Sequence, residues 1–430
     1  MEYKEILDYC IKNLKIKGAD KSKCSLNLDE KREFYFKNNK IRMLRTAYNA
    51  NLKLVSIIEN KIGMTTINKL DKESLDKAIE ETIALTSASE PDPANDISEL
   101  QPSADFVYGV TNPDNNKMFT RLYEFLTHVN AAYPFIHLEE GGVSYERNNI
   151  YFKNSNGVDY SQNQAYYQFL VVFTSKKDGK ISSINYTWKL MNDLEEKLID
   201  SVNLKALLKQ SMDEIDAISI EHQFEGDIII TPDCMGEMLE PIVNHLRDHY
   251  LITEASLFKD KLNTKIASEK LTLRSNPVFK TSAIKSFINE DGYKNENAVI
   301  IEKGILKTFL LTLYGSKKTG KNRALTDGSN LSVDSGSASL SEMIKNTSKG
   351  IILGRFAGGY PSANGDFSGS AKNSYYIENG EIKFPVKEIM ISGNVFRMLQ
   401  DIVEVSKESV DFGYCKYPWM KVKNITVSGK

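Results

Sequence analysis

Two histidines carry the clearest chemical pattern in this sequence. His245 and His249 lie four residues apart, in a chain that has only five histidines. On an α-helix, side chains at i and i+4 project from one face, so two imidazoles can converge on one zinc ion. Asp248 or the distant Cys415 could supply a further ligand. Histidines at this spacing are more commonly exposed or capping residues, so the spacing alone leaves both interpretations open.

Whether the two histidines share a face depends on the secondary structure around them. Apolar spacing predicts a helix from Cys234 to about Tyr250, directly after a β-run from Gly226 to Thr231. After this helix the pattern is mostly β with glycine-punctuated turns. Segments 299–306 and 376–382 each predict a tight hairpin with a glycine where a positive φ is required.

The N-terminal half alternates between helical and β patterns. We expect helices at 3–15, from a cap near Asp71, at 118–132 and at 194–215, and strands at 32–36, 41–46, 51–58, 64–67, 135–145, 150–152, 165–174 and 181–189. The first four strands predict an antiparallel meander. The stretch 89–116 is rich in Pro, Asp and Asn and predicts a long surface connection, either a lid or a linker.

These elements together predict an α+β fold with two domains. The first, 1–222, would be an α+β domain with an antiparallel or mixed sheet. The second, 223–430, would be a β-rich domain with tight hairpins.

Composition narrows the class of protein. The 430 residues are 41% hydrophobic and 26% charged, as in ordinary globular proteins, and 55 basic residues nearly balance 57 acidic ones. No run of like charge predicts a nucleic-acid partner, and no apolar run predicts a membrane span or a signal peptide. The four cysteines form no CxxC pair, which favours reduced thiols and a cytoplasmic location.

The C-terminal sequence resembles a known family, TldD/PmbA. Four segments match its C-terminal signature in order: Asn364-Gly365-Asp366-Phe367-Ser368, Ile377-Glu378-Asn379-Gly380-Glu381-Ile382-Lys383-Phe384-Pro385-Val386, Ile391-Ser392-Gly393-Asn394 and Val422-Lys423-Asn424-Ile425-Thr426-Val427-Ser428-Gly429. Segments 255–262 and 291–306 continue the match upstream. The family has also been called modulators of DNA gyrase. The resemblance implies a cytosolic metalloprotease of two unlike subunits that acts on peptides.

Only one branch of this family carries the metal, and the resemblance assigns the branch through the two positions where the other branch has histidines. The TldD branch has an HExxxH helix and a distant ligand cysteine, whereas the PmbA (TldE) branch lacks the histidines. By the family's spacing, HExxxH falls on 239–244, where Glu240 matches but Leu239 and Asn244 replace both histidines. Leucine has no lone pair to donate to a metal, and an amide oxygen is a poor zinc ligand. Cys415 lies near the expected ligand cysteine but cannot hold an ion alone.

The sequence therefore predicts a PmbA-like subunit with no catalytic residue and no metal of its own. We expect zinc only in a TldD-like partner, unfolded peptides as substrates, and a possible homodimer when the chain is isolated. One alternative is a self-sufficient zinc peptidase that uses His245, His249 and Cys415, with Glu240 as base. A second alternative, a gyrase modulator or another regulatory binding protein, follows only from the family's older name.

Overall fold

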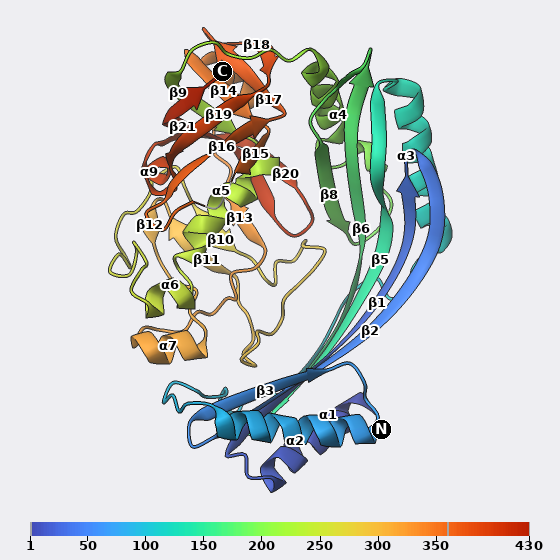
Figure 1. Cartoon of the computed structure of the whole chain (residues 1–430), viewed down its shortest axis with the longest axis vertical. Helices are drawn as coiled ribbons and strands as arrows, with labels where there is room; N and C mark the ends of the chain where they lie inside the picture. The colour runs from blue at the N-terminus through green and yellow to red at the C-terminus, as the bar shows by residue number, and fades with distance from the viewer. Residues whose placement is uncertain (1, 359–360, 430) are drawn as a thin grey trace.

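The computed structural model describes residues 2–358 and 361–429, and within them it contains two large sheets that lie side by side (Figure 1). Helices make up 24% of the structure and strands 42%, and neither sheet closes into a barrel. The predicted α+β class is therefore confirmed. None of the described helices has the length and apolar character that crossing a membrane requires.

The first sheet has eight strands and is built from unusually long ones. Its strands are β1 (Lys21–Lys37), β2 (Lys40–Ile58), β3 (Lys61–Ile67), β4 (Ala104–Gly109), β5 (Ile136–Asn154), β6 (Asp159–Lys177), β7 (Lys180–Ile181) and β8 (Asn185–Met191). The order along the sheet is β3-β2-β1-β5-β6-β4, with β7 and β8 paired to β6. All these pairs are antiparallel except β4 with β6, so the sheet is mixed.

The predicted meander is confirmed, but its strands are fewer and longer than expected. The segments expected at 41–46 and 51–58 form one strand, β2, and those at 135–145 and 150–152 form one strand, β5. The residues between them, 47–50 and 146–149, continue the strands because they pair with neighbouring strands: 47–50 with β1, and 146–149 with both β1 and β6. β2 pairs with β1 over nearly its whole length.

Helices cover the other face of this sheet. They are α1 (Tyr3–Ile16), α2 (Lys72–Ala88), α3 (Asn115–Ala132) and α4 (Leu204–Asp213), with 3-10 turns at Leu198–Asp200 and Glu214–Asp216. Asp71 caps α2 as predicted, because its side chain accepts the Ser74 N–H. The apolar faces of α1 and α2 enclose one core cluster with β1 and β2, and α3 and α4 enclose a second with β5 and β6.

Three expectations for this half were wrong in part. The connection at 89–116 contains β4, which pairs with β6. The helix expected at 194–215 is only α4 with flanking 3-10 turns. The strand expected at 181–189 begins at Asn185, as β8. Each of these segments pairs with or packs against residues far away in the sequence, which local patterns do not encode.

The second sheet is formed by thirteen strands from the C-terminal half. They are β9 (Phe224–Ile230), β10 (Leu273–Ser275), β11 (Ala298–Glu302), β12 (Ile305–Leu306), β13 (Leu331–Val333), β14 (Lys349–Leu353), β15 (Arg355–Gly358), β16 (Asp366–Lys372), β17 (Ser374–Glu378), β18 (Glu381–Val386), β19 (Ile389–Asn394), β20 (Ile402–Asp411) and β21 (Lys416–Ser428). The helices of this half are α5 (Pro232–Asn244), α6 (Asp248–Ile252), α7 (Leu313–Thr319), α8 (Leu340–Lys345) and α9 (Val395–Gln400).

The centre of this sheet is buried on both faces. In β9, Ile228 and Ile230 belong to the main C-terminal core, whereas Ile229 between them belongs to a smaller cluster on the opposite face. Successive side chains of a strand point to opposite faces, so such a run marks a sheet covered on both sides. The two predicted hairpins are confirmed as β11–β12 and β17–β18, with positive φ at Gly304 and Gly380.

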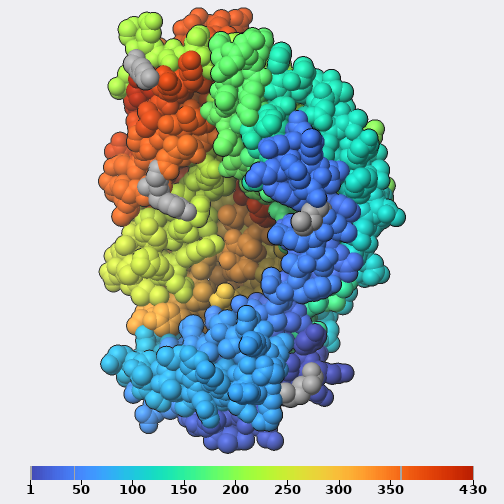
Figure 2. Space-filling model, turned by 45° about the vertical axis from the view of Figure 1, so that its right-hand side comes forward, coloured from blue at the N-terminus to red at the C-terminus, as the bar shows by residue number. Residues whose placement is uncertain are grey.

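The two halves are tied together by the long irregular segment 276–297 and by the tip of the β20–β21 hairpin. Gln162 and Gln164, on the face of β6 that carries no helix, accept the N–H groups of Phe287 and Lys285. At the hairpin, the Leu190 N–H of β8 donates to the carbonyl of Phe412 at 2.9 Å. Figure 2 shows the molecule hollowed between the first strands, in blue, and the C-terminal half, in yellow-green to orange.

Candidate functional site

The two histidines do not share a helix. α5 ends at Asn244, and His245 is its C-cap. The chain then turns through i→i+3 bonds, from the Leu246 N–H to the Val243 carbonyl and from the Arg247 N–H to the Asn244 carbonyl, before α6 begins. The prediction of one helix to Tyr250 was therefore wrong at its C-terminal end. The i, i+4 geometry that a two-histidine metal site needs is lost.

His245 is part of the core. Its side chain is 3% exposed, and its ring stacks on Tyr250 with centroids 4.0 Å apart and meets Phe396 edge-on at 4.8 Å. Its Nδ1 accepts the Leu257 N–H at 3.3 Å, and burial lowers the pKa of the imidazole. His245 is therefore neutral at neutral pH and acts as a buried aromatic residue.

The neighbours of His245 have other roles. His249 is exposed, and its ring meets that of Tyr250 edge-on at 5.5 Å. The Asp248 carboxylate accepts the Thr312 N–H at 3.0 Å and the Thr312 hydroxyl, so it holds the start of α7, where Thr312 is the N-cap. Neither residue is directed to a common ligand with His245.

The positions to which the resemblance assigns the family's HExxxH motif, 239–244, lie on α5, where the side chains differ in burial. Leu239 is 2% exposed and packs in the main C-terminal core. Glu240 is exposed and lines a pocket of about 240 Å³ with Glu237 and Phe356. Asn244 is half-buried at the end of the helix. An aliphatic core side chain and one amide do not fit a zinc site.

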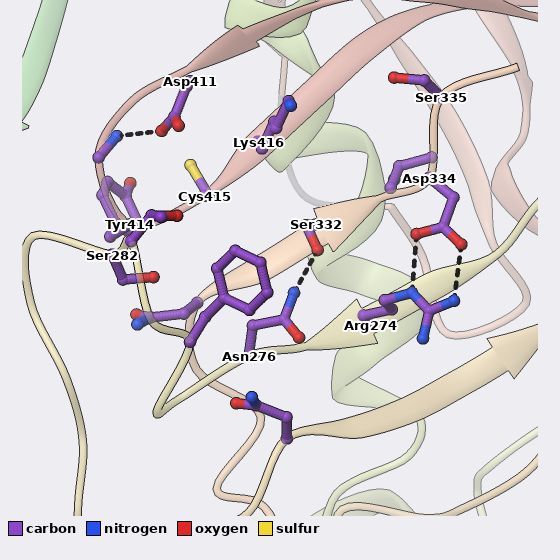
Figure 3. Close-up of a pocket in the computed structure, with 16 residues that line it drawn as sticks. Arg274, Asn276, Ser282, Ser332, Asp334, Ser335, Asp411, Tyr414, Cys415 and Lys416 are labelled. Atoms are coloured by element: carbon purple, nitrogen blue, oxygen red, sulfur yellow. Dashed lines mark hydrogen bonds and ion pairs between the residues drawn. The ribbon is translucent and has the colours of Figure 1, made fainter.

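Cys415 lies elsewhere, in a polar groove of about 510 Å³ (Figure 3). It directly precedes β21, at the hairpin tip that also carries Asp411 and Tyr414. The thiol is 6% exposed, and burial raises its pKa to about 12. A protonated, buried thiol is neither a ready nucleophile nor a ready metal ligand.

The groove opens where the second sheet is weakly paired. β13 and β21 are joined through a single residue pair, Ser332 with Lys416. On its floor, Arg274 donates to both carboxylate oxygens of Asp334, at 2.7 and 2.8 Å, and Asn276 donates to Ser332 at 2.6 Å (Figure 3). Three asparagines, one bidentate ion pair and the hairpin tip thus surround an opening with many hydrogen-bonding groups.

A second polar cluster joins β8 to α5 beside this region. Arg355 is 5% exposed, stacks on Tyr186 at 4.0 Å, and donates to the Asp233 carbonyl at 2.9 Å and to Asn185 at 3.3 Å. Burial raises the pKa of the Asp233 carboxyl to about 6, although Arg355 opposes the shift. Burial also raises the pKa of Glu237, whose carboxylate lies 3.4 Å from the Tyr186 hydroxyl. These contacts make the cluster a link between the two sheets.

The described part of the chain contains no cluster of side chains that could coordinate a metal ion. Across residues 2–358 and 361–429, no three His, Cys, Asp or Glu side chains gather closely enough to hold one ion. His245, His249 and Cys415 in particular are not brought together. The described residues therefore do not fit the zinc site that the resemblance implies for the metal-bearing branch.

Sequence reasoning missed the groove. Arg274, Asn276, Ser332 and Asp334 come from segments separated by more than 50 residues, and none stands in a recognisable motif. The only local signal was the hairpin turn at Gly413, whose φ of 88° requires a glycine-like backbone. Such a turn predicts a hairpin but not a cavity.

Comparison with known proteins identifies the C-terminal half. Residues 224–429 match the PmbA/TldA metallopeptidase C-terminal domain. A zinc metalloprotease TldD homolog from Saccharolobus solfataricus is 30% identical over 232 residues, which cover 48% of this chain and 52% of that protein. The chain spans about half the length of the curated relatives it matches first.

Two solved structures share the whole fold. A protein described as a modulator of DNA gyrase from Bacteroides thetaiotaomicron aligns over 100% of this chain and 99% of its own, with a TM-score of 0.87 and 22% identity. TldE from Thermococcus kodakarensis aligns over 99% of this chain and 100% of its own, with a TM-score of 0.82 and 18% identity. At these identities the likeness establishes the fold alone. Residues 224–429, just under half of this chain, therefore form the C-terminal domain of the PmbA/TldD metallopeptidase family.

Proposed function

We propose that this chain is a metal-free, PmbA (TldE)-like subunit of a cytosolic two-subunit peptidase, and that it binds unfolded peptides for a TldD-like partner that carries the zinc. The observation that supports it most is the composition of α5. Leu239 is a core residue, and Asn244 offers only an amide at the second histidine position. A chain that kept the family's fold but not its ligands is suited to a supporting role.

The groove beside Cys415 is the peptide site in this proposal. Its volume of about 510 Å³ is in the range of ligand pockets. It lies where β13 and β21 separate, so an extended peptide could run alongside a strand and form main-chain hydrogen bonds that are tolerant of sequence. The groups of Asn276, Ser332 and Lys416 could bind the peptide's polar atoms.

Metal analysis tests the metal-free part of the proposal. We expect the purified chain to contain far less than one zinc per molecule and to hydrolyse no peptide alone. Peptidase activity should appear when a TldD-like partner is added, and a chelator should abolish it. Stoichiometric zinc in the isolated chain, or chelator-sensitive hydrolysis by the chain alone, would contradict the proposal and favour a self-sufficient peptidase.

A groove-filling variant tests peptide binding. Ser332→Trp places a large ring in the groove and should weaken binding of fluorescein-labelled unfolded casein at least tenfold, measured by anisotropy. Ser341→Trp, on the exposed side of α8, is the matched control and should leave binding within twofold. Equal binding by both variants, with unchanged circular dichroism, would place the peptide site elsewhere.

A further inference from the structure

The outer edge of the first sheet is unpaired over a long stretch. β2 runs from Lys40 to Ile58, but β3 pairs with it only from Leu52 to Ile58. The stretch from Lys40 to Asn51 therefore has β1 on one side and no strand among the described residues on the other. At 3.4 Å per residue, this stretch, here called the β2 edge, is about 40 Å long. Figure 1 shows β2 as the outermost strand on that side.

Apolar side chains border the β2 edge on one face. Leu44 is 48% exposed and Tyr48 is 69% exposed, and Leu44 lies opposite Phe34 of β1. Phe34 in turn meets the ring of Phe119 on α3 at 5.7 Å, and Phe119 stacks on Tyr123 at 6.1 Å. Exposed aromatic groups beside an open strand are what strand-adding partners use for specificity.

The charge of the β2 edge is of one sign. The β2 edge contains three basic residues, Lys40, Arg42 and Arg45, and no Asp or Glu. Arg45 pairs with Glu33 of β1. Lys40 and Arg42 are exposed, and neither forms an ion pair with any described residue. A second copy of this strand would place basic groups against basic groups, whereas an acidic strand would be attracted.

We propose that the β2 edge is a docking site for an extended, acidic segment of another protein, which adds to the sheet as a further strand. The backbone of the β2 edge supplies the hydrogen bonds, Leu44 and Tyr48 contact alternate apolar side chains, and Lys40 and Arg42 bind the carboxylates. This site is separate from the groove beside Cys415, which is lined by residues 274–335 and 411–416. It does not depend on the proposed peptidase role.

The test uses a fluorescein-labelled ten-residue peptide of alternating Glu and Val, and a matched peptide of alternating Lys and Val. We expect the acidic peptide to bind the full chain at least tenfold more tightly than the basic one. Lys40→Glu/Arg42→Glu should weaken this binding at least tenfold. Lys12→Glu/Lys15→Glu, which makes the same charge change on the exposed side of α1, should leave it within twofold.

Two further measurements separate strand addition from simple charge attraction. N-methylation of every second residue of the acidic peptide removes backbone donors and should weaken binding at least tenfold. Hydrogen exchange within 40–51 should slow when the unmethylated peptide is added. Unchanged binding by the methylated peptide, or protection confined to other segments, would overturn the proposal.

Two rival occupants are outcomes of the same experiment. The first rival is a second copy of this chain. The proposal is overturned in its favour if sedimentation shows self-association that Lys40→Glu/Arg42→Glu abolishes and that the acidic peptide does not change. A single-stranded oligonucleotide of twelve nucleotides is the second rival. If it binds more tightly than the acidic peptide, and Lys40→Glu/Arg42→Glu abolishes that binding, the proposal is overturned in favour of nucleic acid.

Discussion

The two sheets of this protein differ in how many of their faces are buried. In the second sheet, β9 and β14 carry consecutive isoleucines that pack into cores on both sides. In the first sheet, helices cover one face, and the other presents Gln162, Gln164 and other polar residues to the C-terminal half. A sheet covered on both faces serves as a scaffold, whereas one with an open face and an open edge can bind. The groove beside Cys415 therefore lies at a weakly paired junction of the second sheet, whereas the first sheet has a face without helices and an unpaired edge at β2.

The largest effect should come from the centre of the second sheet. Ile351 of β14 is fully buried, between β9 and β17. Ile351→Ala removes a side chain that neighbouring strands cannot replace, so we expect the free energy of unfolding to fall by about 2–5 kcal/mol. Urea denaturation followed by tryptophan fluorescence measures the change. A loss below about 1 kcal/mol would mean that this sheet is not the rigid scaffold described.

The link between the sheets should depend on pH. The pKa of Asp233 is about 6 in the folded protein because of burial, against an ordinary value near 3.9 when unfolded. Between these values the unfolded chain loses its proton first, so stability falls as pH rises from about 4 to 6. The shift of two units corresponds to about 3 kcal/mol. Asp233→Asn cannot titrate at this position.

The difference in unfolding free energy between the wild type and Asp233→Asn should therefore shrink by about 3 kcal/mol, or change sign, as pH rises through this window. Denaturation midpoints at pH 4, 5, 6 and 7 give this difference directly. A difference that is constant across these pH values would mean that the Asp233 carboxyl titrates alike in both states.

A smaller effect should arise at the polar face of the first sheet. Gln164 is 4% exposed and accepts the Lys285 N–H at 3.0 Å. Gln164→Ala leaves that N–H without its partner, so we expect a loss of about 1–2 kcal/mol and faster hydrogen exchange in 276–297. Gln168→Ala is the control, because Gln168 lies on the same face of β6 and its side chain forms no hydrogen bond with a described residue. Equal exchange in both variants would remove the polar face as the link between the halves.

The smallest effect should occur at the β2 edge. Tyr48 is 69% exposed. Tyr48→Ala should change the free energy of unfolding by less than about 0.5 kcal/mol, because the ring is mostly in water in the folded state. It should nevertheless weaken binding of the acidic peptide several-fold. A large loss of stability would show that Tyr48 supports the sheet and that the β2 edge is not simply a binding surface.

The elements that local patterns encode were predicted well. α1, α3 and the Asp71 cap of α2 follow from apolar periodicity and capping chemistry, and the hairpins at Gly304 and Gly380 follow from their positive φ. Local patterns did not predict the continuity of β2 and β5, because the residues at the expected breaks, 47–50 and 146–149, are held in the strands by pairing with residues far away in the sequence. The strand β4 escaped notice because only its pairing with β6 defines it.

The candidate site also has features that the sequence predicts and features that only the tertiary structure shows. From the family's spacing, the sequence alone predicted that Leu239 and Asn244 stand where histidines would be, and this assignment stays a prediction. The C-terminal signature also predicted the family of the C-terminal domain, and the match at 224–429 confirms that prediction. The tertiary structure decided that α5 stops at Asn244, that His245 packs against aromatic rings, and that distant segments enclose a groove beside Cys415. The physical reason is that identity is local, whereas burial, direction and enclosure depend on contacts between residues far apart in the chain.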